Sequence, residues 1–181
     1  MGVSVGKGRG LPGAAPTRTM YDDLFDLLSA LDGVRQDLRY HPESDALYHS
    51  LQTFQLAYHD TDDPTLHAAA LLHDVGKAHA GGDHAEVGAE LLDGLIAPDV
   101  VWLVGHHLDL LRAPGRTRRR LRVRNDAGLA RLERLRRYDV AGRDPRASVL
   151  PVDHALSILM QSRHLLSPTA DPVGHDHAED L

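Results

Sequence analysis

Cysteine is absent from this chain of 181 residues. Disulfide bonds, thiolate zinc sites and cysteine nucleophiles are therefore all excluded. The sequence also lacks any apolar run near the ~20 residues that a membrane-spanning helix needs, and it shows no signal-peptide pattern. Together these absences predict a cytoplasmic protein with no membrane contact.

Positive charge is scarce overall, because the formal net charge is −6. This balance gives no global argument for nucleic-acid binding. Segment 112–137 is the exception, since it holds eleven arginines. A local basic patch of this kind can collect phosphate groups or bind nucleic acid. A solvated face balanced by nearby acidic residues is an equally good interpretation, so nucleic acid is an alternative partner that the sequence does not favour.

Strand signals are nearly absent, whereas helical periodicity recurs along most of the chain. Hydrophobic residues make up 42% of the sequence, which is ordinary for one globular domain of this length. We predict an all-α domain over residues 20–168, between a disordered segment 1–19 and a polar tail 169–181. Pro114 and Gly115 are expected to mark a loop. The expected helices span residues 20–32, 44–59, 64–76, 84–96, 98–111, 126–141 and 151–165.

One of these helices ends in an unusual pair of polar residues, His73 and Asp74 in "AAALLHDVGKAH". The run before them is apolar nearly all round, which indicates a buried helix. A carboxylate at its C-terminal end is disfavoured by desolvation and by the negative end of the helix dipole. A positive charge should compensate, and a metal ion is the simplest candidate.

Further polar residues fall on the apolar stripes of their helices and are expected to point into the core. A lone inward histidine is usually a hydrogen-bonded core residue, but this chain has 13 histidines and several lie on such stripes. Together with two carboxylates they form a nitrogen and oxygen ligand set that suits iron, manganese, zinc or nickel better than calcium. His106 lies on a neighbouring face as the alternative to His107, whereas His154 lies on a polar face. The six inward groups are His49, His73, Asp74, His84, His107 and Asp139.

These residues resemble the pattern of the HD-domain superfamily of metal-dependent phosphohydrolases. The pattern is a histidine, the His-Asp doublet, often one or two further histidines, and a final aspartate, for which Asp153 competes with Asp139. The resemblance covers residues 36–145 and implies a helical bundle of six to seven helices around a buried site for one or two divalent ions. The matching residues are His49 in "DALYHSLQ", His73 and Asp74 in "LLHDVGK", His84 in "DHAEVGA", His107 or His106 in "WLVGHH", and Asp139 in "RRYDVAG".

The resemblance implies a hydrolase that acts on a small phosphorylated or nucleotide substrate through metal-activated water. Asp74 and Lys77 would be its catalytic residues, with Asp74 as a ligand or proton acceptor. Lys77 would hold a phosphate oxygen, and its alternative role is that of a solvated cation at a helix end. Arg112 would hold a further phosphate at the mouth of the site. The run "DHAEVGAELL" is also similar to the HD domains attached to CCA-adding tRNA nucleotidyltransferases.

Two other functions stay open. The ligand set is also similar to the diiron oxygenase branch of the superfamily, which includes myo-inositol oxygenase and the oxygenases that cleave phosphonates. Tyr40 and Glu43 resemble a tyrosine and a glutamate that guard the iron site in the phosphonate enzymes, and both are therefore candidate substrate-site residues. Lys77 stands where those enzymes have a histidine and myo-inositol oxygenase has a lysine. A non-catalytic nucleotide-binding domain is the third function, and a homo-oligomer is compatible with all three.

Overall fold

The structure is a computed structural model that describes residues 18–162 and residue 165. The predicted polar tail 169–181 and nearly all of the predicted disordered segment 1–19 lie outside these residues. Thr19 is described, and its hydroxyl accepts a hydrogen bond from a backbone N–H in the first turn of the first helix. This capping interaction satisfies one of the donors that every helix start leaves free.

The described residues form helices, with one isolated β-bridge between Arg35 and Asp45 and no β-strand among them. The predicted all-α fold is therefore confirmed. Within this part of the chain, no helix combines the length and apolar character needed to cross a membrane. The helices are α1 (Met20–Ser29), α2 (Ala46–Asp60), α3 (Pro64–Leu72), the 3₁₀ helix η1 (Val75–Ala78), α4 (His84–Leu92), α5 (Pro98–His106), α6 (Asp109–Arg112), α7 (Pro114–Arg124), α8 (Asp126–Ala141) and α9 (Val152–Met160).

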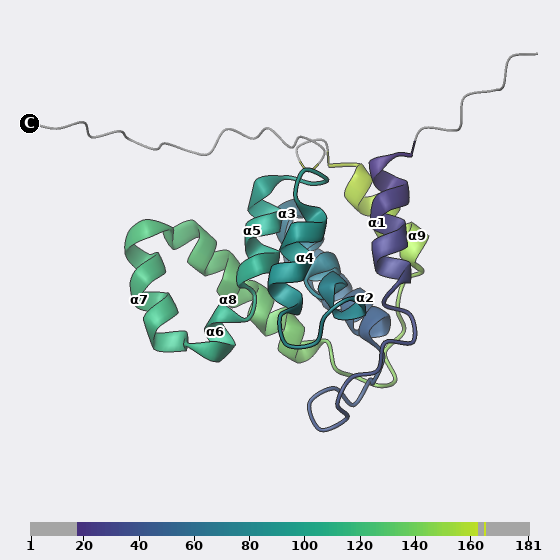
Figure 1. Ribbon diagram of the computed structural model, residues 1–181, viewed down its shortest axis with the longest axis horizontal. Coiled ribbons are helices and arrows are strands. Elements are labelled where there is room, and N and C mark those ends of the chain that lie inside the picture. The colour runs from purple at the N-terminus through teal and green to yellow at the C-terminus, as the bar shows by residue number, and fades with distance from the viewer. Residues whose placement is uncertain (1–17, 163–164, 166–181) are drawn as a thin grey trace, which may run out of the picture.

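The helices pack as three neighbouring pairs and a separate group. Helix α4 lies beside α5, α2 packs against α3, and α1 lies beside α9 (Figure 1). Helices α6 and α7 lie on the side of the bundle away from α1 and α9 (Figure 1). Helix α8 runs from α7 into the bundle, where it packs against α2 and α3. The centre of the bundle therefore receives side chains from α2, α3, α4, α5 and α8.

Helix α3 is buried along nearly its whole length, as its apolar sequence predicts. Every residue in Thr65–Leu72 is buried. Asp63 caps its start, and Pro64 occupies the first position, where a missing N–H costs no hydrogen bond. The helix ends at residue 72 rather than at the predicted residue 76. His73 and Asp74 consequently lie at the junction between α3 and η1, inside the bundle.

Gly76 brings η1 and α4 into close contact. A Cβ atom at this position would lie 2.1 Å from the backbone oxygen of His84 and 2.7 Å from the backbone nitrogen of Gly88. Real Cβ atoms do not approach backbone atoms this closely, so the contact requires a residue without a side chain. The contact places the first residue of α4, His84, beside Asp74.

Two helix predictions need correction. The predicted helix 98–111 is divided into α5 and α6. The predicted loop at Pro114 is instead the first turn of α7, because proline is well tolerated at the first position of a helix. The buried residues of α7 are Thr117 and Leu121. An apolar stripe this short, within an arginine-rich run, did not reveal the helix.

Candidate metal centre

Asp74 lies at the centre of the polar cluster and is 1% exposed. Four imidazole rings, from α2, the end of α3, the start of α4 and the end of α5, direct their Nε2 atoms toward its carboxylate. Five of the six predicted inward groups therefore come together around one carboxylate. The Nε2 atoms of His73 and His49 lie 3.4 and 3.9 Å from Asp74 Oδ2, and those of His84 and His107 lie 3.4 and 3.8 Å from Asp74 Oδ1.

Backbone carbonyls fix the orientation of all four rings. The Nδ1 atom of each ring lies close to a carbonyl oxygen, which can only accept a hydrogen bond. Each Nδ1 therefore carries a hydrogen, and each Nε2 is the ring atom that faces Asp74. Metal-ligating histidines are held in the same way, because the outer hydrogen bond sets the tautomer and the ring direction. The distances are 2.8 Å from His49 to Gly142 O, 3.0 Å from His73 to Ala70 O, 2.8 Å from His84 to Gly81 O and 2.7 Å from His107 to Val104 O.

This arrangement calls for a cation. Imidazole lone pairs and carboxylate oxygens that face one another across less than 4 Å repel unless positive charge lies between them. The Nε2 atoms of His49 and His73 are buried, and neither makes a hydrogen bond within the described structure. A buried polar atom without a partner is costly. The donor set, imidazole nitrogen with carboxylate oxygen, therefore fits a divalent transition metal.

The ligand atoms form two groups that share Asp74. His49 and His73 make one group with this carboxylate, and His84 and His107 make the other. Within each group the ligand atoms lie within 4.8 Å of one another. Each oxygen of Asp74 serves a different pair of rings. Asp74 could therefore serve as a ligand for one ion or for two.

Burial sets the charge state of the central groups. It lowers the pKa of His73 to about 3, although the neighbouring carboxylate of Asp74 acts in the opposite direction. The pKa of His107 is also lowered by burial. Burial alone would raise the pKa of Asp74, but the adjacent His73 ring and the ammonium group of Lys77 outweigh burial and hold that pKa well below its usual range. Two neutral imidazoles and an ionised carboxylate result, which are the forms that bind metal.

Asp139 is the sixth predicted group, and it approaches the cluster from α8. Its Oδ1 atom lies 3.3 Å from Nε2 of His49. Two guanidinium groups also hold this carboxylate, Arg136 at 2.7 Å and Arg143 at 3.0 Å. Burial alone would raise the pKa of Asp139, but the neighbouring imidazoles of His49 and His73 lower it far more. The competing aspartate, Asp153, is exposed at the start of α9.

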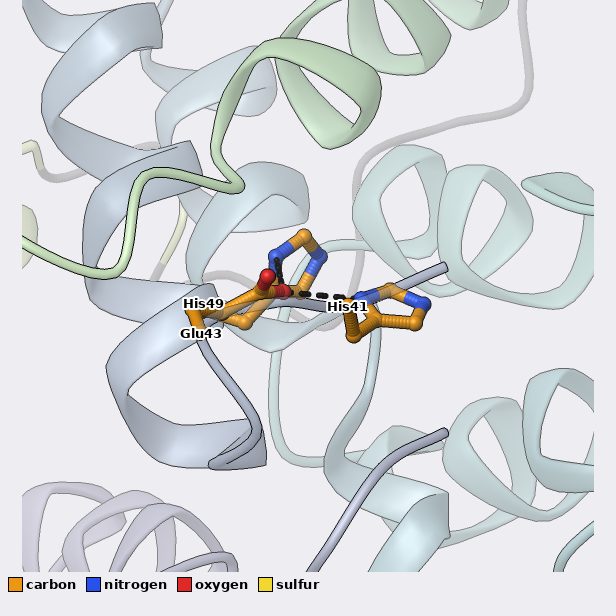
Figure 2. Close-up of side chains that lie close together, drawn as sticks. All are labelled: His41, Glu43 and His49. Carbon is orange, nitrogen blue, oxygen red and sulfur yellow. Dashed lines mark hydrogen bonds and ion pairs between the residues drawn. The ribbon is translucent and has the colours of Figure 1, made fainter. Parts of the chain in front are cut away.

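Glu43 connects His49 to a further histidine that the sequence analysis did not consider. Its Oε1 atom lies 3.0 Å from Nδ1 of His49 and 2.8 Å from Nδ1 of His41 (Figure 2). The Glu43 side chain is fully buried. Burial alone lowers the pKa of His49, but the carboxylates of Asp139 and Glu43 raise it to about 9. The His49 ring therefore carries a proton near neutral pH unless a metal ion displaces that proton from Nε2.

A pocket of about 270 Å³ opens beside the cluster. Lys77 and His84 belong to both the pocket wall and the cluster. The ammonium group of Lys77 lies 2.7 Å from Asp74 Oδ2 and donates a hydrogen bond to the side-chain oxygen of Gln36. A ligand in this pocket would thus meet a lysine that is already directed at the central carboxylate. The lining residues are Val34, Arg35, Gln36, Asp37, His41, Lys77, Gly81 and His84.

Tyr40 and Glu43, which were predicted as substrate-site residues, are not part of this pocket wall. Tyr40 is 62% exposed, and the Arg39 guanidinium lies 5.6 Å from its ring centroid. Glu43 lies against Nδ1 of His49, whereas the Nε2 atom of that ring faces Asp74. The structure thus places Glu43 as a support for a candidate ligand and leaves Tyr40 at the surface.

Arg112 and His106 also lie outside the cluster. Arg112 binds Glu86 at 2.9 Å and the carbonyl oxygen of Gly82 at 2.8 Å, next to the pocket wall. His106 is half-buried and pairs with Asp109 at 3.1 Å. His107, rather than His106, is therefore the histidine of this pair that faces Asp74.

Sequence reasoning missed the pocket residues before α2 and the arginines around Asp139. Gln36 and His41 lie in an irregular segment, where no periodic pattern indicates which side chains point inward. His41 stands next to Tyr40 in "YHPES", so the motif that drew attention to Tyr40 and Glu43 also contained the residue that reaches the pocket. Arg143 follows the end of α8, and nothing in its local sequence distinguishes it from the other arginines.

A helical bundle that gathers a His-Asp doublet, further histidines and a distant aspartate defines a class of metal-binding domain. The sequence profile of the HD domain matches residues 46–146, more than half of the chain. The chain belongs to the HD-domain family. The matched range contains all six clustered groups and Lys77, but it begins after Glu43 and after the pocket residues that precede α2.

Curated proteins match shorter parts of the chain. The multifunctional CCA protein of Nitrosococcus oceani is 43% identical over 54 residues, which cover 30% of this chain and 13% of that protein. The multifunctional CCA protein of Methylococcus capsulatus is 38% identical over 87 residues, with 42% and 20% covered. The bifunctional uridylyltransferase/uridylyl-removing enzyme of Gluconobacter oxydans is 48% identical over 52 residues, with 24% and 5% covered. The match thus spans at most a fifth of the length of these relatives.

Proposed function

We propose that this HD domain is a metal-dependent phosphohydrolase that acts on a small phosphorylated or nucleotide substrate. One observation carries the proposal. Four imidazole Nε2 atoms surround a buried carboxylate, and the cluster borders a pocket at which Lys77 stands. An ion held by this cluster and the cation of Lys77 beside it would together suit the binding of a phosphate group.

The metal would be held by His49, His73, Asp74 and Asp139, with His84 and His107 completing a second position around Asp74. A divalent ion bound there supplies an activated water near neutral pH and neutralises negative charge on phosphoryl oxygens. Iron, manganese, zinc and nickel all suit this nitrogen and oxygen donor set.

The chain's own side chains would bind and orient the substrate. Lys77 offers its ammonium group to a phosphoryl oxygen and stays positioned by Asp74 and Gln36. Arg35 lines the same pocket and can meet a second anionic group. The volume of about 270 Å³ suits a small phosphate ester, or one nucleotide unit of a larger molecule.

The relatives support this class of reaction without defining the substrate. One of them is named for removing a uridylyl group, which is consistent with a nucleotide substrate. Since this chain covers only 5% of that enzyme, its activity, substrates and partners are not transferred as a whole.

A specific observation also favours a second candidate, a diiron oxygenase. The two groups of ligand atoms share Asp74, as a bridged pair of irons would require. In that case the pocket would hold an oxidisable substrate, and Lys77 would bind its anionic group.

Metal content and activity together distinguish the phosphohydrolase from the diiron oxygenase. The protein is purified without chelators or added metal, and its metals are identified and counted. It is then assayed for hydrolysis of p-nitrophenyl phosphate and bis(p-nitrophenyl) phosphate, and for oxygen consumption. Hydrolysis dependent on manganese, zinc, nickel or iron supports the phosphohydrolase. A pair of irons with oxygen uptake and no hydrolysis supports the oxygenase. Failure to bind metal even after reconstitution would leave a nucleotide-binding domain without catalysis.

A further inference from the structure

Helix α7 is an unusually basic element in an acidic protein. It contains six arginines and no acidic residue, whereas the whole chain has a formal net charge of −6. Arg118 pairs with Glu133 at 2.7 Å, and Arg120 pairs with Asp109 at 3.0 Å. Within the described residues, no carboxylate lies within ion-pair distance of the other four, all of which are exposed: Arg116, Arg119, Arg122 and Arg124.

The arginine-rich segment 112–137 therefore has two parts, which differ in whether the arginines pair with carboxylates. The arginines of α8 mostly bind carboxylates of the bundle, as Arg131 does with Asp63 and Arg137 does with Asp60. Those residues form the balanced, solvated face that was one of the two interpretations of the sequence. The uncompensated charge is concentrated on α7.

Three of these four arginines, Arg116, Arg119 and Arg122, share the outward face of α7. Thr117 and Leu121 face inward and are buried, so residues spaced three apart on the other side point to solvent. With a rise of about 1.5 Å per residue, Arg116, Arg119 and Arg122 follow one another at intervals of about 4.5 Å along the helix. A nucleic-acid strand carries its charges at comparably close spacing, about 3.4 Å per phosphate along a duplex axis.

The residue two positions before α7 lies next to the pocket wall. Arg112, just before α7, donates a hydrogen bond to the carbonyl oxygen of Gly82, and the preceding residue, Gly81, lines the pocket. A strand on α7 that continued past its start toward Arg112 would therefore approach the pocket wall. The only large apolar side chain exposed on α7 is that of Val123, so the helix offers no apolar face to insert into a lipid layer.

We propose that the outward face of α7, formed by Arg116, Arg119 and Arg122, binds the sugar–phosphate backbone of a nucleic acid. Guanidinium groups pair with phosphate oxygens through two parallel hydrogen bonds, and the contacts read no base sequence. Binding at this face requires no metal and does not depend on the proposed hydrolysis.

The test uses the full chain and a short fluorescein-labelled RNA strand, with binding followed by fluorescence anisotropy over a series of salt concentrations. The variant R116Q/R119Q/R122Q is compared with R18Q/R137Q/R146Q, which removes the same charge from exposed arginines elsewhere. We expect the α7 variant to bind about tenfold more weakly or worse, and its salt slope to fall by about 2, since each lost contact to a single strand removes about 0.7. The control variant should keep the wild-type slope.

Three results would overturn the proposal: wild-type protein that does not bind RNA at low salt, equal losses in both triple variants, or binding to phosphatidylserine vesicles in place of RNA. Circular dichroism checks that the variants are folded, and the single change R119Q serves if the triple variant is not. Measuring RNA binding by Asp74→Asn separates this proposal from the proposed function. That variant should lose hydrolysis and retain RNA binding, so either activity can fail without the other.

Discussion

The ammonium group of Lys77 lies 2.7 Å from Oδ2 of Asp74, the carboxylate that four histidine rings surround. Lys77 therefore provides a positive charge beside the candidate metal ligands. Its side chain remains partly exposed to the pocket, whereas Asp74 is buried. The pair connects the interior of the cluster to the space where a substrate would bind.

Lys77→Gln should reduce kcat/KM for a phosphate ester about a hundredfold, because a charged donor to the phosphoryl group is lost. Metal content should stay at the wild-type level, since none of the imidazole ligands is changed. Steady-state kinetics and metal analysis on the same preparation check this. Loss of metal together with activity would show that Lys77 positions Asp74 and does not act by binding the substrate.

His73→Ala should abolish metal binding, because its Nε2 atom is buried, has no hydrogen bond and faces Asp74. His154→Ala is the matched control, since His154 is exposed on α9. The measurement is metal stoichiometry after purification and reconstitution. Full metal content in His73→Ala would remove His73 from the ligand set.

Glu43→Ala should weaken metal affinity by about 10- to 100-fold, because the Glu43 carboxylate lies 3.0 Å from Nδ1 of His49 and helps orient that ring. Glu43→Gln retains an acceptor oxygen and should restore part of the affinity. Titration against a competing chelator gives the values, and the exposed Glu90→Ala serves as control. Unchanged metal affinity in Glu43→Ala would mean that the carbonyl of Gly142 is sufficient to orient His49.

Gly76→Ala should destabilise the fold by about 1–3 kcal/mol or more, because the added methyl group would collide with the backbone of α4. Gly81→Ala is the control, since a Cβ atom there meets nothing within 4 Å. Denaturant unfolding of the two variants gives the comparison. Equal stability would mean that η1 and α4 can separate without cost.

The ion pair between Asp63 and Arg131 should make stability depend on pH. Burial raises the pKa of Asp63, but the hydrogen bond and charge of Arg131 outweigh it, so the pKa is lower in the folded protein. A lowered folded pKa stabilises the fold above the unfolded value, about 3.9, and this contribution is lost as the pH falls below it. Asp63→Asn keeps a helix-capping side chain and should cost less than about 1 kcal/mol near neutral pH.

The difference in unfolding free energy between wild type and Asp63→Asn should therefore shrink as the pH falls from about 5 toward 2. The neighbouring exposed residue provides the control, Asp62→Asn, which should show no such trend. A difference that persists at the lowest pH would indicate that the ion pair is not its source.

Most of the fold could be predicted because its helices have apolar stripes long enough to be recognised. Val100, Leu103 and Val104 are buried as their spacing indicates, and His107 continues the same stripe into the cluster. The alignment of polar residues with these stripes also predicted which groups would point inward. Helix α7 escaped prediction because only two of its residues are buried.

The surroundings of the cluster could not be predicted in the same way. The carbonyls that hold the histidine rings are backbone atoms, which leave no trace in residue type. His41 and Gln36 lie in irregular segments, where no period relates sequence to direction. Arg143 reaches both Asp139 and the carbonyl oxygen of Tyr40, 103 residues away along the chain. Such contacts depend on the packing of distant elements.

The two halves of the cluster differ in how far apart their parts lie along the chain. Asp74 and His84 are joined by a short segment that contains η1, in which Gly76 packs closely against α4. By contrast, 93 residues separate His49 from the carbonyl of Gly142 that orients it. Closing a long loop costs more entropy than closing a short one. The half near His84 can thus assemble from elements that are close in the sequence. The half around His49 and Asp139 forms only after α2 has packed against the end of α8.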